Sequence, residues 1–76
     1  MPYLLEVEWI DSTTYNGWKL KEDADKLKCF RIQSSGYFVK RNGQNVILAM
    51  NHSLEDEDVS MCTVIPRGCI TDVRFK

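Results

Sequence analysis

Long hydrophobic runs are missing from this 76-residue chain. No stretch approaches the roughly 20 apolar residues that a membrane-spanning helix needs. The first residues, MPYLLEVEWID, also lack the basic segment and apolar core of a secretory signal peptide. These absences argue against a membrane or exported protein, and we expect a cytoplasmic one.

Cysteine is also scarce, with three residues at Cys29, Cys62 and Cys69. The number is odd, and no CxxC pair is present. Small secreted proteins usually carry an even set of cysteines. Each cysteine lies beside apolar or β-branched residues, so we predict reduced and mostly buried thiols rather than disulfides or metal ligands.

The sequence offers little to catalysis. It has one histidine, His52, which falls in a polar segment with no motif for a nucleophile and base around it. The acidic run Glu55–Asp58 lacks the glycine and alternating ligands of a calcium loop, and no glycine-rich phosphate loop occurs. We therefore expect a protein that is not an enzyme and uses no cofactor and no metal.

An excess of one charge is absent as well. The chain has 10 Lys and Arg against 11 Asp and Glu, a formal net charge of −1. A dedicated nucleic-acid-binding protein usually has a clear basic excess. The overall balance counts mildly against that role, although local basic patches can override it.

What is present is the pattern of β-strands. Leu5, Val7 and Trp9 alternate with Glu6 and Glu8, which predicts a half-buried strand. Further strands are predicted at 29–41, 46–50, 59–65 and 69–75, with one short helix within 19–28. A chain of this length has room for one core, so we expect one domain covering residues 1–76.

The segment 29–41 is long for a flat strand. Phe30 and Ile32 share one parity, whereas Tyr37 and Val39 share the other, and Gly36 lies near the change. A bulge or sharp bend at the glycine would explain this. We predict a mostly β fold, a small five-stranded, strongly bent sheet or barrel of Sm-like or SH3-like type. A partly open barrel would pair its edge with a neighbouring subunit, so a homo-oligomer is expected.

The C-terminal two-thirds of the chain resembles the Sm-like proteins in pattern. The shared features are the bent strand with a central glycine, the Gly36–Val39 run, the aliphatic Val46–Leu48 strand, and the Ile65–Gly68 turn before a short last strand. Two departures stand out. Sm-like chains begin with a helix where this chain has a strand, and their RNA-contacting Asp and Asn residues have no convincing counterpart here.

A second resemblance spans nearly the whole chain. The segments that carry it are Trp9-x-Asp11-Ser12, Gly17-Trp18, Gly36–Val39, Val46–Ala49 and Ile65–Ile70. They look like a family of small uncharacterised proteins of phages and prophages. This resemblance implies a viral or mobile-element origin without an assigned chemistry. Such proteins often act by binding, and some form ring-shaped sponges that sequester the nucleotide signals of bacterial immunity.

Aromatic and basic residues near turns are the best candidates for a binding site. Tyr15 and Trp18 flank Asn16-Gly17, while Lys40, Arg41 and Arg67 lie at predicted strand ends. Rings can stack on a base and cations can bind phosphate. The alternative is that Trp18 plugs the open end of a barrel and Tyr15 covers it.

Two functions follow from these observations. The first is a homo-oligomeric binding module for a nucleotide or nucleic acid, which uses the five residues Tyr15, Trp18, Lys40, Arg41 and Arg67. The second is a protein-interaction module that modulates a host protein, with the acidic run Glu55–Asp58 as its contact patch or nucleic-acid mimic.

Overall fold

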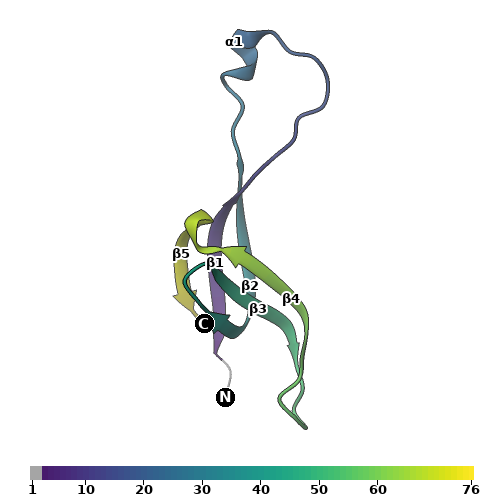
Figure 1. The fold of residues 1–76 in the computed structure, drawn as a ribbon, viewed down its shortest axis with the longest axis vertical. Helices are drawn as coiled ribbons and strands as arrows, with labels where there is room; N and C mark the ends of the chain where they lie inside the picture. Colours follow the sequence, from purple (N-terminus) through teal and green to yellow (C-terminus); the bar gives the residue numbers. More distant parts are fainter. Residues whose placement is uncertain (1–2) are drawn as a thin grey trace.

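The computed structural model describes residues 3–76 and contains one antiparallel sheet of five strands in the order β4-β3-β2-β1-β5 (Figure 1). The prediction of a mostly β fold with five strands and one short helix is therefore confirmed. The elements are β1 (Leu4–Asp11), α1 (Lys21–Ala24), β2 (Phe30–Arg41), β3 (Asn45–His52), β4 (Val59–Pro66), a 3-10 helix η1 (Arg67–Cys69) and β5 (Ile70–Phe75).

The long strand β2 holds the two halves of the sheet together. Its residues from Phe30 to Tyr37 pair with β1, and those from Tyr37 to Arg41 pair with β3. The unusual length of segment 29–41 is thus explained, because the first part of β2 pairs with β1 and the last part pairs with β3. Strand β5 then pairs with the free side of β1, and β4 with the free side of β3.

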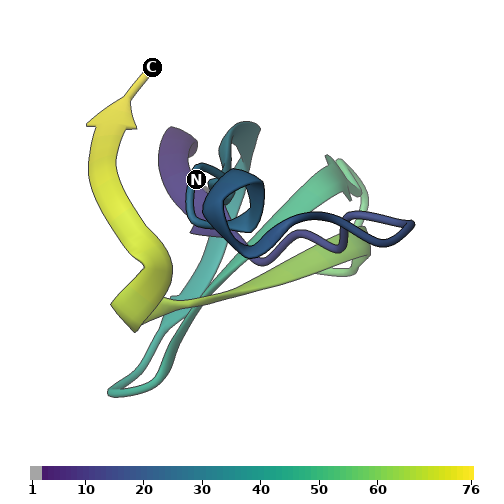
Figure 2. The same cartoon turned by 90° about the horizontal axis from the view of Figure 1, so that it is seen from above.

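The sheet is neither closed nor strongly curled, so the barrel and the strong bend that we predicted are not observed. A barrel needs a ladder between its first and last strands. Within residues 3–76, β4 pairs only with β3 and β5 only with β1, which leaves both as edge strands. The three-residue η1 joins the end of β4 to the start of β5, and β5 otherwise stands apart from β4 (Figure 2).

Gly36 does not mark a change of parity. Ser34 faces Val7 and Gly36 faces Leu5 in regular register with β1, so this part of β2 keeps its alternation. The glycine is needed for a close approach instead. A Cβ at Gly36 would lie 2.9 Å from the carbonyl oxygen of Ala49 and 3.1 Å from the Cβ of Leu48.

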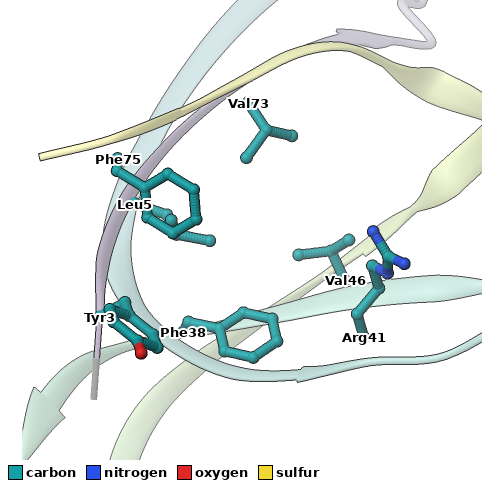
Figure 3. Close-up of a pocket in the computed structure, with 7 residues that line it drawn as sticks. All are labelled: Tyr3, Leu5, Phe38, Arg41, Val46, Val73 and Phe75. Carbon is teal, nitrogen blue, oxygen red and sulfur yellow. The ribbon is translucent and has the colours of Figure 1, made fainter. Parts of the chain in front are cut away.

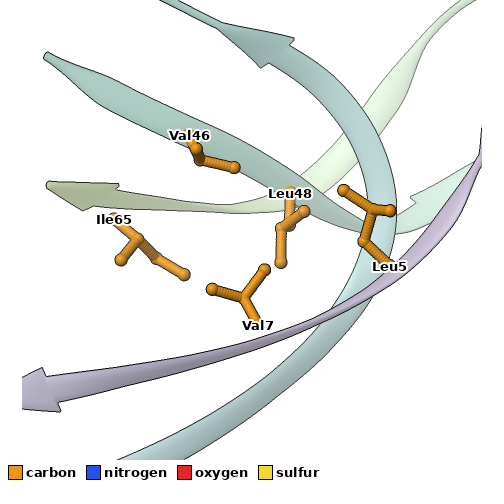
Figure 4. Packing of buried hydrophobic residues seen from close by; sticks show 5 residues of the cluster. All are labelled: Leu5, Val7, Val46, Leu48 and Ile65. Atoms are coloured by element: carbon orange, nitrogen blue, oxygen red, sulfur yellow. The ribbon is translucent and has the colours of Figure 1, made fainter. Parts of the chain in front are cut away.

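The core is a small cluster on one face of the sheet. It consists of Leu5, Val7, Val46, Leu48 and Ile65, contributed by β1, β3 and β4 (Figure 4). The alternation of apolar and acidic residues in β1 explains its share of this cluster, because every second side chain of a strand points to the same face. Trp9, Phe38 and Ile70 pack against the cluster and are partly buried.

The connection from β1 to β2, residues 12–29, projects from the sheet as an arm, and the molecule extends 55 Å along its longest axis (Figure 1). None of these residues is buried. The predicted helix within 19–28 is shortened to the four residues of α1. One exposed turn makes too few hydrogen bonds and contacts to propagate further.

The three cysteines are free, as predicted, but they are not mostly buried. Cys29 and Cys62 are exposed and Cys69 is half-buried. Cys29 lies at the end of the arm, and Cys62 lies on the edge strand β4, whose residues are exposed apart from Ile65. In the part of the chain that the structure describes, no helix is long and apolar enough to cross a membrane.

Candidate functional site

A pocket of about 590 Å³ lies beside the core (Figure 3). Its size falls within the range of small-molecule sites, about 300–1,000 Å³. Of the described residues that line it, Arg41 alone is charged, and the others are apolar or aromatic. The lining consists of Tyr3, Leu5, Phe38, Arg41, Val46, Val73 and Phe75.

Strands β1 and β5 build one wall of the pocket. Leu5 pairs with Phe75 and Val7 with Val73, so alternate side chains of β5 come to the same face as the β1 core residues. Phe75 is 76% exposed and contacts Tyr3 edge to face, with ring centroids 5.9 Å apart. The two rings form a rim, because each leaves much of its surface uncovered.

The opposite wall comes from β2 and β3, and a β-bulge at Val39 determines which side chains it offers. Phe38 pairs with Leu48, but Lys40 pairs with Ile47, so one extra residue of β2 lies between them. Strict alternation would put Phe38 and Lys40 on one face. The bulge instead brings Arg41, paired with Val46, to the face of Phe38 and turns Lys40 to the other side.

The guanidinium of Arg41 has no hydrogen bond or ion pair within residues 3–76. The other arginines do. Arg31 pairs with Glu8, Arg74 pairs with acidic groups on β1 and β5, and Arg67 donates to the carbonyl oxygen of Asn42 at 3.2 Å. Arg41 is exposed beside apolar side chains, and its donors are unused by the described residues, so its guanidinium is available to an anion.

Arg67 lies close to the same end of the sheet. Its backbone N–H donates to the carbonyl oxygen of Gln44 at 2.8 Å, which ties η1 to the β2–β3 turn. The turn itself is held by Asn42, whose Oδ1 accepts hydrogen bonds from the N–H groups of Gln44 and Asn45. Two of the predicted cations, Arg41 and Arg67, thus flank this turn, while Lys40 is carried on the opposite face.

Tyr15 and Trp18 are not part of this site. The Tyr15 hydroxyl donates to the carbonyl oxygen of Lys28 at 2.8 Å, and its ring packs edge to face on Phe30, so Tyr15 stabilises the base of the arm. Trp18 is fully exposed, with a relative accessibility of 104%. The structure therefore does not bring Tyr15 and Trp18 to Arg41 and Arg67, and Trp18 plugs no barrel, because its side chain is exposed and the described sheet is open.

A network of charges covers the other face of β1 and β5. Arg74 donates to Asp72 at 2.8 Å and to Glu8 at 3.1 Å, and Lys76 pairs with Glu6 at 3.4 Å. The hydrogen bond from Arg74 lowers the pKa of Asp72 below its ordinary value, and the same contact raises the pKa of Arg74. Every acid here has a basic partner, so the network serves to fasten β5 to the sheet.

The acidic loop Glu55–Asp58 joins β3 to β4 and lies close in sequence to His52. Ser53 Oγ accepts hydrogen bonds from the N–H groups of Glu55 and Asp56, which shapes an exposed hairpin loop. His52 ends β3 and lies against the ring of Tyr37, with centroids 5.9 Å apart. Among residues 3–76, no group of three or more His, Cys, Asp or Glu side chains could hold a metal ion.

Sequence reasoning found Arg41 but missed the pocket around it. Most of its lining looks like ordinary core positions in the sequence, because the alternation is that of any half-buried strand. This holds for Tyr3, Leu5 and Phe38 and for Val73 and Phe75 of β5. The bulge at Val39 has no sequence signal of its own, since valine fits a regular strand well. Only the pairing of β2 with β3 shows that Phe38 and Arg41 share a face.

Comparison with protein-family models, with curated proteins and with solved structures gave no match.

Proposed function

We propose that the protein is a non-enzymatic binding module that acts as a homo-oligomer and binds a nucleotide or nucleic-acid ligand. The observation that carries this proposal is the free guanidinium of Arg41 at an apolar pocket rimmed by aromatic rings. A base can lie against the rings while its phosphate pairs with the guanidinium. Arg67, beside the adjacent turn, adds positive charge that attracts the same anion.

The two free edges of the sheet support the homo-oligomer. Strand β4 has eight residues and β5 has six, and both are exposed along most of their length. Edge strands offer unpaired N–H and C=O groups to another chain. Pairing of β4 with β5 of the next copy would be a head-to-tail contact, which closes into a ring when the rotation between copies allows it.

The phage or prophage origin belongs to the same proposal. A small protein that binds a nucleotide tightly and works in the cytoplasm of its host would lower the free concentration of that nucleotide by binding alone. Sequestration of a signal used in bacterial defence is one role that this chemistry fits.

The alternative function is a protein-interaction module that modulates a host protein. One observation favours it: Trp18 stands fully exposed on an arm whose base is fixed by Tyr15 and Phe30. Exposed tryptophan side chains are frequent anchors at protein interfaces. In this alternative the acidic loop Glu55–Asp58 supplies a second contact.

Native mass spectrometry of the protein purified from a bacterial host tests the proposal. We expect an oligomer carrying a ligand whose mass, released on denaturation, is that of a nucleotide or oligonucleotide. The variant R41A/R67A should lose the ligand, because it removes both cations that flank the β2–β3 turn. The matched control E55Q/E57Q should keep it, since it changes as many charges on the remote hairpin loop.

A monomer without ligand that also fails to bind added nucleotides would contradict the proposal. Capture of a host protein that is lost in W18A or in E55Q/E57Q, and kept in R41A/R67A, would establish the alternative function instead.

A further inference from the structure

The chemistry of the pocket narrows the class of ligand beyond the function proposed above. Apart from Arg41 and the hydroxyl of Tyr3, the side chains that line it are hydrocarbon. A polar group held against this hydrocarbon lining would give up water and gain no hydrogen bond in return. Sugar hydroxyls and additional phosphates are therefore disfavoured inside the pocket, whereas a flat apolar or aromatic ring is favoured.

Arg41 determines which charge the ligand of this pocket carries. Among the described residues it is the one cation of the lining, and the bulge at Val39 turns the neighbouring Lys40 to the opposite face of the sheet. One guanidinium matches one carboxylate, sulfonate or phosphate, which it can hold through two parallel hydrogen bonds. No acidic residue from 3 to 76 lines the pocket to oppose that anion, and Glu6 and Glu8 lie on the other face, where they pair with Arg74, Lys76 and Arg31.

We infer that this pocket binds a compact aromatic anion, with the ring between the Phe38 wall and the Phe75 wall and one anionic group on Arg41. Figure 3 shows these side chains facing one another across the pocket, with Arg41 at one end. Arg41 is thus the residue that selects for negative charge, and the rings select for a planar body. The inference rests on the proposed function for the location of the site, and it limits a nucleotide ligand to one that inserts its base and leaves its sugar outside.

The test uses the aromatic monoanion 8-anilinonaphthalene-1-sulfonate as the probe, titrated against the full chain and followed by its fluorescence. We expect saturable binding with one probe per chain. R41Q should weaken binding by about tenfold or more, the effect of losing a hydrogen bond to a charged group. The uncharged analogue N-phenyl-1-naphthylamine should bind R41Q and the wild type alike, because only the anion uses Arg41.

Two variants serve as matched controls. R31Q and K40Q each remove one positive charge from exposed positions outside the pocket and should leave the probe affinity within about twofold. A probe affinity that is unchanged in R41Q would overturn the inference. So would a loss of binding in W18A, because the probe would then be reporting the exposed arm.

Competition by mononucleotides separates this inference from the proposed function. Displacement of the probe by a nucleoside monophosphate supports both. Binding that depends on Arg41 but resists every nucleotide sustains the aromatic-anion site and removes the nucleotide as its ligand. Nucleotide binding that survives R41Q and leaves the probe in place overturns the aromatic-anion site and places the nucleotide at a site other than this pocket.

Discussion

At Gly36, in the middle of β2, an added methyl group would lie 2.9 Å from the backbone oxygen of Ala49. Because that neighbour is main chain, relief requires β2 and β3 to move apart. We expect Gly36→Ala to lower the free energy of unfolding by about 1–3 kcal/mol, the usual cost of overpacking. Urea denaturation measures it.

Gly43→Ala is the control for that experiment. A Cβ at Gly43 meets no atom within 4 Å and the residue has no positive φ, so its substitution should change stability by less than about 1 kcal/mol. Equal losses of stability in Gly36→Ala and Gly43→Ala would show that the close approach of β2 and β3 does not require a glycine at position 36.

The contact between Asp72 and Arg74 predicts that the stability of the sheet depends on pH in the acid range. Its pKa is lowered in the folded state by the hydrogen bond from Arg74. A carboxyl with a lowered pKa stabilises the fold above its unfolded pKa, near 3.9, and this contribution is lost as the pH falls through the lower folded value. We therefore expect Asp72→Asn to flatten the decline in stability below about pH 4.

Thermal unfolding measured across that pH range, with Asp25→Asn of the exposed arm as the control, tests this expectation. Superimposable profiles for the wild type and Asp72→Asn would contradict it.

At the scale of elements, the arm from residue 12 to residue 29 contributes little to the sheet. None of its residues is buried, and its contacts with β2 are local ones near Phe30. We expect replacement of residues 14–28 by a short glycine-rich turn to lower the melting temperature by no more than about 8 °C, which corresponds to roughly 1 kcal/mol in a chain of this size.

Leu48→Ala provides the contrast, since Leu48 lies in the core cluster and its truncation should cost about 2–5 kcal/mol. Calorimetry of both variants measures the difference. An arm deletion that unfolds the protein would mean that residues 14–28 form part of the cooperative core.

The strands could be predicted from the sequence because alternation and turn residues are local signals. Leu5, Val7 and Trp9 reach one face as expected, and all five strands lie close to their predicted ranges. The arrangement of the site could not be predicted in this way. The pocket depends on the pairing of β5 with β1, which are distant in the chain, and on the bulge at Val39, where the residue type favours a regular strand.

For the whole molecule, the free edges predict the state of association. Val64 and Met61 of β4 are 56% and 65% exposed, and Met61 has a left-handed backbone with φ of 57°. A lysine on an edge strand opposes pairing with another chain. We expect M61K/V64K to convert the proposed oligomer to a monomer without loss of the folded sheet, as measured by sedimentation velocity and circular dichroism.

Leu54→Lys is the matched control, because Leu54 is 97% exposed but belongs to the β3–β4 hairpin loop. An oligomer that resists M61K/V64K and dissociates in Leu54→Lys would place the contact between copies at the hairpin rather than at the edge.

The three residues of η1 join two strands that lie on opposite edges of one sheet. In an assembly that pairs β4 of one copy with β5 of the next, this short connector links the two strands through which each subunit contacts its neighbours. The number of copies in the proposed ring would then depend on the geometry of Arg67–Cys69 together with the twist of the sheet from β4 to β5.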